Sequence, residues 1–109
     1  MITKQLVIEK FIEYNKEYFG NKLETPSFYM LTSKLPYGSC VRKKDRKCNI
    51  LISRYINDMD FFSSVLIHEM IHQYVYQVLG GFRYTILQHG PLFLITRYIL
   101  KKKYKIDIC

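Results

Sequence analysis

The segment from Phe61 to Leu79, FFSSVLIHEMIHQYVYQVL, is apolar on almost every side and constrains the fold more than any other part of the chain. This pattern predicts a central helix that is buried by its neighbours, because a surface helix would keep one polar face. Three ionisable side chains interrupt the segment, namely His68, Glu69 and His72. Burial of such groups is costly unless something compensates them. We therefore expect these three side chains to share a partner.

The spacing of these residues suggests that the partner is a metal ion. On a helix, His68 and His72 project from the same face, because residues four apart lie one above the other. Glu69 lies about 100° further round and could reach a water on that metal without binding the metal itself. This arrangement is typical of a zinc hydrolase. The alternative is two hydrogen-bonded histidines and a glutamate on a buried helix.

A third metal ligand should lie further along the chain, because a catalytic zinc usually takes three protein ligands and a water. No glutamate follows Glu69, and the HExxHxxGxxH spacing is absent. The remaining candidates are His89, Asp107 and Cys109. His89 precedes Gly90-Pro91, which is typical of a helix start, and the loop after Gly80-Gly81 lets the chain reverse. We therefore predict His89 as the third ligand; otherwise it is an ordinary polar residue near a helix start.

HEMIH at 68–72, followed by His-Gly-Pro-Leu-Phe at 89–93, resembles the HExxH…HGxxF signature of the SprT-like zinc metalloproteases, the group that includes the DNA–protein-crosslink protease Spartan. The N-terminal region also resembles the family's first helix and the turn after it, at Phe11, Asn15, Tyr18, Phe19 and Leu23. The resemblance covers the protease core, without the cysteine-rich zinc ribbon or long tails of several members. It implies one catalytic Zn²⁺ held by His68, His72 and His89, with Glu69 as the general acid/base.

Two other kinds of zinc site remain open. A non-proteolytic hydrolase of the deformylase type would replace the third histidine with a cysteine, which Cys40 in Gly-Ser-Cys could supply. A zinc-stabilised structural or DNA-binding domain without catalysis would close the metal with four ligands, for example the three histidines plus Cys40. In that second case Glu69 has no chemical role.

The patterns elsewhere predict a small zincin-like α+β domain that spans residues 1–109 as a single unit. An apolar stripe predicts a helix from Lys4 to Phe19, which Gly20-Asn21 ends. Three short strands are predicted at Ser27–Thr32, Ser39–Lys43 and Lys47–Ser53, with a charged turn at 44–46. Asn57, Asp58 and Asp60 offer N-caps for the HExxH helix. We expect an N-terminal helix, a three-stranded antiparallel sheet, the HExxH helix and a C-terminal helix.

Composition points to a folded intracellular protein. The chain has 109 residues, of which 49% are hydrophobic, so it can bury one core and is too short for two ordinary domains. The start MITKQLVIEKF has charges within any hydrophobic run and does not read as a secretory signal, and no run is long enough to span a membrane. Three cysteines without a framework pattern suit reduced thiols in the cytoplasm.

Charge is the second functional clue, because the formal net charge is +8. Two basic clusters stand out, at Arg42, Lys43, Lys44, Arg46 and Lys47 and at Lys101, Lys102 and Lys103. They could bind nucleic-acid phosphates, and nearby tyrosines could stack on unpaired bases, at Tyr37, Tyr55, Tyr98 and Tyr104. We therefore expect binding to DNA that prefers single strands and ignores sequence. The alternative is an ordinary solvated turn and a helix end whose lysines oppose the helix dipole.

The expected chemistry is hydrolysis of a protein or peptide by zinc-activated water, with Glu69 as the base that takes the water's proton. One edge of the sheet could hold an extended substrate by backbone hydrogen bonds. A further donor could stabilise the oxyanion, and the candidates by residue type are Tyr37, Arg83 and Tyr84.

Overall fold

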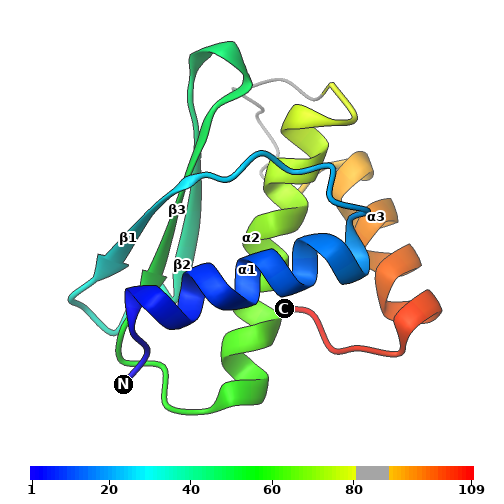
Figure 1. Cartoon of the computed structure of the whole chain (residues 1–109). Coiled ribbons are helices and arrows are strands. Elements are labelled where there is room, and N and C mark those ends of the chain that lie inside the picture. Colours follow the sequence, from blue (N-terminus) through cyan, green and yellow to red (C-terminus); the bar gives the residue numbers. More distant parts are fainter. Residues whose placement is uncertain (81–88) are drawn as a thin grey trace.

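The described residues form three α-helices and a three-stranded sheet (Figure 1), in a computed structural model that describes residues 1–80 and 89–109. The elements are α1 (Lys4–Tyr18), β1 (Ser27–Leu31), β2 (Gly38–Arg42), the 3-10 helix η1 (Lys44–Arg46), β3 (Cys48–Ser53), α2 (Met59–Gln77) and α3 (Pro91–Tyr104). The predicted α+β class is therefore confirmed. No helix in the described ranges combines the length and the apolar character needed to cross a membrane.

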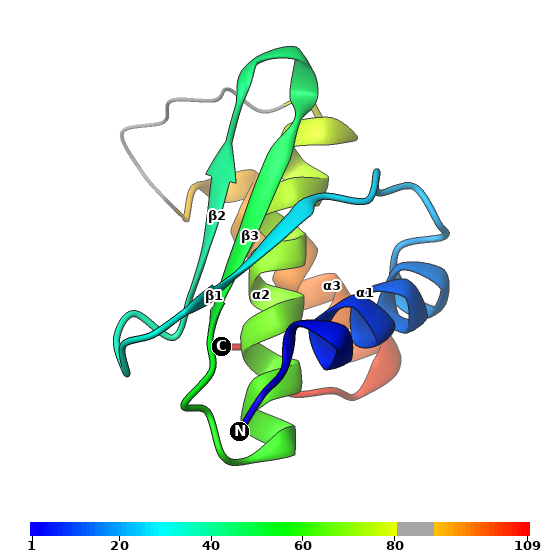
Figure 2. The same ribbon diagram turned by 60° about the vertical axis from the view of Figure 1, so that its left-hand side comes forward.

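Helix α2 is the centre of the fold, lying between the sheet and α3 (Figures 1 and 2). It begins because the Asp58 side chain, one of the three predicted caps, accepts hydrogen bonds from the backbone amides of Asp60 and Phe61. Its side chains Leu66 and Met70 have no exposed surface. Burial on several faces follows from the apolar sequence and confirms the expected central helix.

The sheet is mixed, with strand order β1-β3-β2. Strands β2 and β3 pair antiparallel across η1, with Cys40 opposite Ile50, as the charged turn predicts. Strand β1 pairs parallel to β3, with Phe28 opposite Ile50, so the expectation of an all-antiparallel sheet is wrong for this strand. The physical reason is burial: β3 carries the fully buried Ile50 and Ile52 and takes the central position, which separates β1 from β2.

Helix α1 packs across β1 and α2 through its predicted apolar stripe. The rings of Phe11 and Phe28 meet edge to face with centroids 5.3 Å apart. The buried Asn15 side chain accepts a hydrogen bond from the amide of Leu23 and donates one to its carbonyl, at 3.1 and 2.9 Å. Asn15 therefore fixes the turn at Gly20-Asn21, where both residues have positive φ.

The segment after α3 turns back onto α2. Pro91 opens α3 after the N-cap Gly90, and Lys105 ends it in a left-handed conformation with φ 54°. This reversal brings Ile108, which is only 2% exposed, into the core. The buried Ile108 thus places Cys109 beside the middle of α2, as its contacts with Ser64 and His68 show.

Candidate metal centre

The three predicted metal-binding histidines come together in the structure. Each histidine offers one ring nitrogen as a possible ligand atom, and these three atoms all lie within 4.8 Å of one another. His68 and His72 project from the same face of α2, and His89 reaches them from the residue before Gly90, the N-cap of α3. The Nε2 atoms of His68 and His89 lie 3.1 Å apart. Among the described residues, this is the group that could hold a metal ion, and it excludes Asp107, Cys40 and Cys109.

A backbone carbonyl fixes which nitrogen of His68 faces the other imidazoles. His68 Nδ1 lies 2.8 Å from the carbonyl oxygen of Cys109. Because that oxygen can only accept, Nδ1 carries the hydrogen and Nε2 keeps its lone pair for a ligand. Ser64 Oγ and Cys109 Sγ are also within hydrogen-bond distance at 2.7 Å. Cys109 was one of the candidate ligands, but its backbone carbonyl instead orients a histidine.

The ring of Phe93 packs against the rings of all three histidines. Its ring stacks on His72 with centroids 4.4 Å apart, and it also contacts His68 at 4.9 Å and His89 at 4.7 Å. Phe93 is only 3% exposed. One side chain from α3 therefore restricts the orientation of all three imidazoles, which gives the phenylalanine of the HGxxF run a physical reason.

Burial favours the neutral form of two of the histidines, His68 and His72. Burial, followed by the neighbouring His68 and His89, lowers the pKa of His72 to about 3. Burial also lowers the pKa of His68. Neutral imidazoles keep the lone pairs that a metal requires.

Glu69 is 6% exposed and lies in the same pocket, at the boundary between α2 and β2. Burial raises the pKa of its carboxyl to about 7, against an opposing effect of the Arg42 charge. Among the described residues it forms no hydrogen bond or ion pair with another side chain. A carboxyl group with this pKa can accept and release a proton near neutral pH.

Gly38 allows β2 to lie directly against this carboxyl group. A Cβ atom at Gly38 would lie 3.0 Å from Val65 Cγ1, 3.2 Å from Glu69 Oε2 and 3.2 Å from the carbonyl oxygen of Leu51. Sequence analysis assigned no role to Gly38. The available signal was a glycine at the start of a strand, which often marks a close approach of the backbone.

The pocket that holds these groups has a volume of about 340 Å³. It lies between β2 and α2, with Gly38, Ser39, Cys40 and Arg42 on one side and the histidines and Glu69 on the other. Cys40 lines it as a thiol, because a hydrogen bond with Cys48, together with burial, raises the pKa of Cys40. Cys40 does not belong to the group of described side chains whose ligand atoms come together, which argues against the reading in which Cys40 replaces a histidine.

Arg42 was predicted to bind nucleic acid, but its side chain is half-buried and lines this pocket. Its charge lowers the pKa values of both Glu69 and His72. None of the ion pairs among the described residues involves Arg42. The pocket therefore contains a guanidinium group that forms no ion pair with the described residues and lies near the Glu69 carboxyl group, beside the candidate metal site.

Several other basic residues of the β2–β3 hairpin have structural contacts. Arg46 Nη1 donates to the carbonyl of Tyr76 at 2.6 Å, and its guanidinium lies 5.1 Å from the Tyr76 ring centroid. The Tyr76 hydroxyl donates to the carbonyl of Lys43. Lys47 Nζ lies 3.5 Å from Glu24 Oε1. The contacts with Tyr76 attach the hairpin to the C-terminal end of α2, so the Arg46 charge does not act solely as a solvated surface charge.

The second basic cluster, Lys101, Lys102 and Lys103, forms the last turn of α3. Figures 1 and 2 show the hairpin tip and this helix end at opposite ends of the molecule, so the two clusters do not form one surface. The tyrosines predicted to stack on bases have partners within the protein: Tyr37 with Phe61, Tyr55 with Arg54, Tyr98 with Lys102 and Tyr104 with Tyr18.

The candidate oxyanion donors find no support in the described residues. Tyr37 is absent from the residues that line the metal pocket, and its ring packs edge to face on Phe61. Arg83 and Tyr84 lie outside the described residues, as does the predicted loop at 82–88.

Comparison with protein families agrees with the arrangement of these side chains. The model of the SprT-like family matches residues 7–108, nearly the whole chain. In a comparison with curated proteins, none matches the chain.

Proposed function

The chain belongs to the SprT-like family, and on that premise we propose that it is a zinc-dependent peptidase whose metal is held by His68, His72 and His89. The observation that carries the proposal is the convergence of three imidazoles and one buried carboxyl group in a single pocket. Three imidazole nitrogens are a donor set that zinc takes in catalytic sites, where the fourth position holds water. The donor set therefore fits the metal.

Glu69 is the proposed general base. Zinc held by the three histidines would supply a Lewis acid for the hydrolysis. The Glu69 carboxylate would take a proton from the attacking water and would pass it to the leaving amine. Its position supports this role, because the carboxyl group is only 6% exposed and lines the same pocket as the three histidines.

Strand β2 is the proposed binding edge for an extended substrate. The strand order β1-β3-β2 leaves one edge of β2 without a strand partner in the described part of the chain. Ser39 and Cys40 of this strand line the metal pocket. A peptide that pairs with this edge would be held by backbone hydrogen bonds, which do not depend on its side chains.

Arg42 is the proposed stabiliser of negative charge on the substrate. Its guanidinium lines the same pocket, and no ion pair among the described residues neutralises it. A cation already in place at a buried site stabilises a developing oxyanion without reorganisation. We assign this role to Arg42 and not to Tyr37, which does not line the pocket.

The deciding experiment compares wild type with Glu69→Gln on an unstructured protein such as casein. This variant keeps the size and shape of the side chain and removes the base. We expect zinc content and Tm close to wild type, with turnover reduced by about 10²- to 10⁴-fold. Zinc-loaded Glu69→Gln that still cleaves at the wild-type rate would refute the assignment.

We further propose that the substrates include DNA-bound proteins. The net charge of +8 and the family membership support this class. The exposed lysines of the hairpin lie next to Arg42, so DNA held there would be close to the metal pocket. Cleavage of a histone should increase when single-stranded DNA is added, and casein cleavage should not change. Equal histone cleavage with and without DNA would remove DNA from the function.

A further inference from the structure

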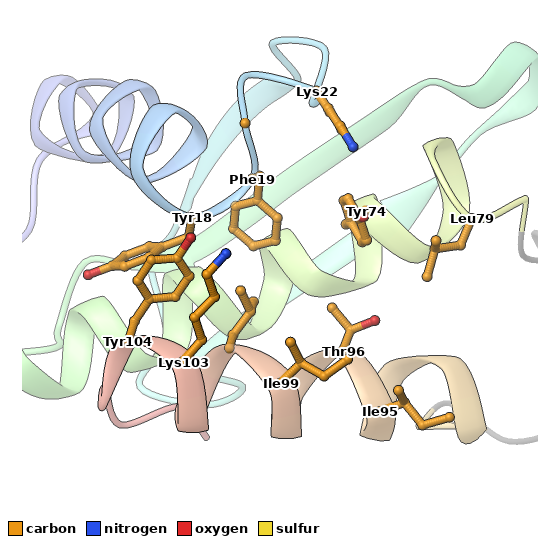
Figure 3. A pocket seen from close by; sticks show the side chains of 12 residues that line it. Tyr18, Phe19, Lys22, Tyr74, Leu79, Ile95, Thr96, Ile99, Lys103 and Tyr104 are labelled. Atoms are coloured by element: carbon orange, nitrogen blue, oxygen red, sulfur yellow. The ribbon is translucent and has the colours of Figure 1, made fainter.

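A second hollow lies between α1, α2 and α3 (Figure 3) and has a volume of about 480 Å³. We call it the apolar groove and define it by Phe19, Tyr74, Leu79, Ile95 and Ile99, with Lys22 and Lys103 at its rim. Tyr74 follows His72 by two residues, which places it about 200° round α2 from that histidine. The apolar groove and the metal pocket therefore lie on opposite sides of the central helix.

The apolar groove is open although its lining is mostly hydrophobic. Leu79, Ile95 and Ile99 are 41%, 55% and 52% exposed. Leu92 continues the same stripe along α3, three residues before Ile95, and is 44% exposed. Helix α3 buries Phe93 and Leu100 against the protein, while about half of the surface of Leu92, Ile95 and Ile99 stays exposed. A continuous apolar surface of this kind in a soluble domain marks a binding site.

Charge at the rim restricts the occupant. Lys22 and Lys103 border the hollow, and no acidic side chain lines it. A second copy of this chain would bring another net charge of +8 to a basic rim, so self-association is disfavoured. The hollow is concave between three helices, whereas a membrane surface suits an exposed convex face. An acidic, partly apolar protein segment matches both the shape and the charge.

We propose that the apolar groove binds an acidic amphipathic helix of a partner protein. The wall from Ile95 to Lys103 is about 12 Å long, enough for two turns of such a helix. Apolar side chains at positions i, i+3 or i+4 and i+7 enter between Tyr74 and Ile99, and flanking Asp or Glu residues meet Lys22 and Lys103. Because the metal pocket lies on the other side of α2, the bound partner leaves the substrate path open and serves to recruit the enzyme.

The test selects binders to the full chain from a displayed library of amphipathic helical peptides whose flanking positions carry random charges. We expect the enriched peptides to be acidic at those positions. Their affinity should fall about tenfold or more in Ile95→Ser/Ile99→Ser, since each lost apolar anchor costs on that order. The matched control is Ile12→Ser on α1, which is 60% exposed and does not line the groove. Tm values of the variants establish that each is folded.

A charge reversal provides the second arm. Lys22→Glu/Lys103→Glu should bind the acidic peptides weakly and select basic ones instead. Three outcomes overturn the proposal. The first is that wild type enriches no more acidic peptides than Ile95→Ser/Ile99→Ser does. The others are that wild type sediments as a dimer which these two substitutions dissociate, or that it floats with phosphatidylserine vesicles and the two substitutions abolish this. Glu69→Gln should bind the same peptides as wild type, so failure of the peptidase assignment is distinguishable from failure of the groove.

Discussion

His68 Nδ1 lies 2.8 Å from the carbonyl oxygen of Cys109, so a residue far along the chain orients an imidazole in the centre of α2. A hydrogen bond to the ring nitrogen that does not bind the metal fixes the tautomer and the ring orientation of a metal-binding histidine. The buried Ile108 side chain and the hydrogen bond from Arg97 Nε to the carbonyl of Ile108, at 3.4 Å, anchor the segment that supplies the carbonyl. The geometry of the candidate metal site thus depends on packing of the C-terminal segment, which sequence motifs do not reveal.

Ile108→Ser should weaken metal binding although Ile108 is not a ligand. The substitution removes the buried anchor of Cys109 and releases the hydrogen bond to His68 Nδ1. We expect zinc affinity to fall about 10- to 100-fold, the usual effect of losing such a support. Competition with a chelator of known affinity measures it.

The control for Ile108→Ser is Val7→Ala, because Val7 is 1% exposed on α1 and does not line the metal pocket. It should lower Tm and leave zinc affinity unchanged. ¹⁵N NMR of the metal-free protein gives an independent readout, since His68 should be the Nδ1–H tautomer in wild type and shift toward Nε2–H in Ile108→Ser. An unchanged tautomer would mean that Cys109 does not orient the ring.

His89→Ala should lose zinc about as severely as His68→Ala or His72→Ala. The three imidazoles have ligand atoms within 4.8 Å of one another, and removing one leaves too few protein ligands for a stable site. Cys40→Ser should retain about one zinc per chain, because Cys40 lies outside that group. Metal analysis after dialysis decides between the readings: loss of zinc from Cys40→Ser with retention in His89→Ala would indicate the cysteine-containing site.

The elements that periodicity controls could be predicted closely from the sequence. The apolar run around His68 gave a central helix, and Asp58 caps it as one of three candidates. The strand positions followed from local patterns, but the direction of β1 did not. Strand order depends on which strand best fills the core, and the complete burial of Ile50 and Ile52 is a property of the assembled fold.

The residues of the candidate site that are recognisable by type and spacing could be predicted from the sequence. His68, Glu69 and His72 followed from helical spacing, and His89 from the small number of alternatives. The roles of Gly38, Arg42 and the Cys109 carbonyl could not be predicted. Gly38 and Arg42 contribute because β2 lies against α2, and the Cys109 carbonyl contributes because the chain folds back onto α2. Arg42 was predicted as part of a charged cluster because its neighbours in sequence are basic, whereas its neighbours in space are Glu69 and His72.

Gly38→Ala should impair catalysis without removing the metal. The new methyl group would meet Val65 Cγ1 at 3.0 Å and Glu69 Oε2 at 3.2 Å, so β2 or the carboxyl group must shift. We expect stability to fall by about 1–3 kcal/mol, as overpacking typically costs. Turnover should fall further than stability explains, with zinc content unchanged. Ser39→Ala in the same pocket is the control and should behave like wild type, and a fully active Gly38→Ala would show that Glu69 tolerates displacement.

The basic hairpin should contribute to DNA binding through Lys43 and Lys44, whose side chains are exposed, while Arg46 attaches the hairpin to Tyr76. Lys43→Gln/Lys44→Gln therefore tests phosphate binding without detaching the hairpin. If both lysines contact phosphates of single-stranded DNA, the slope of log affinity against log salt should become shallower by about 1.4, and affinity should fall. Fluorescence anisotropy across a salt series measures both quantities.

Lys102→Gln/Lys103→Gln is the matched control for that pair, since it removes the same charge at the opposite end of the molecule. Its effect on the salt slope should be smaller than that of the hairpin variant if the bound strand is held at the hairpin, next to the metal pocket. DNA-stimulated histone cleavage should follow the same order. Equal effects of the two variants would assign the DNA affinity to overall charge and not to the hairpin, and no effect of either would leave the lysines as a solubility feature.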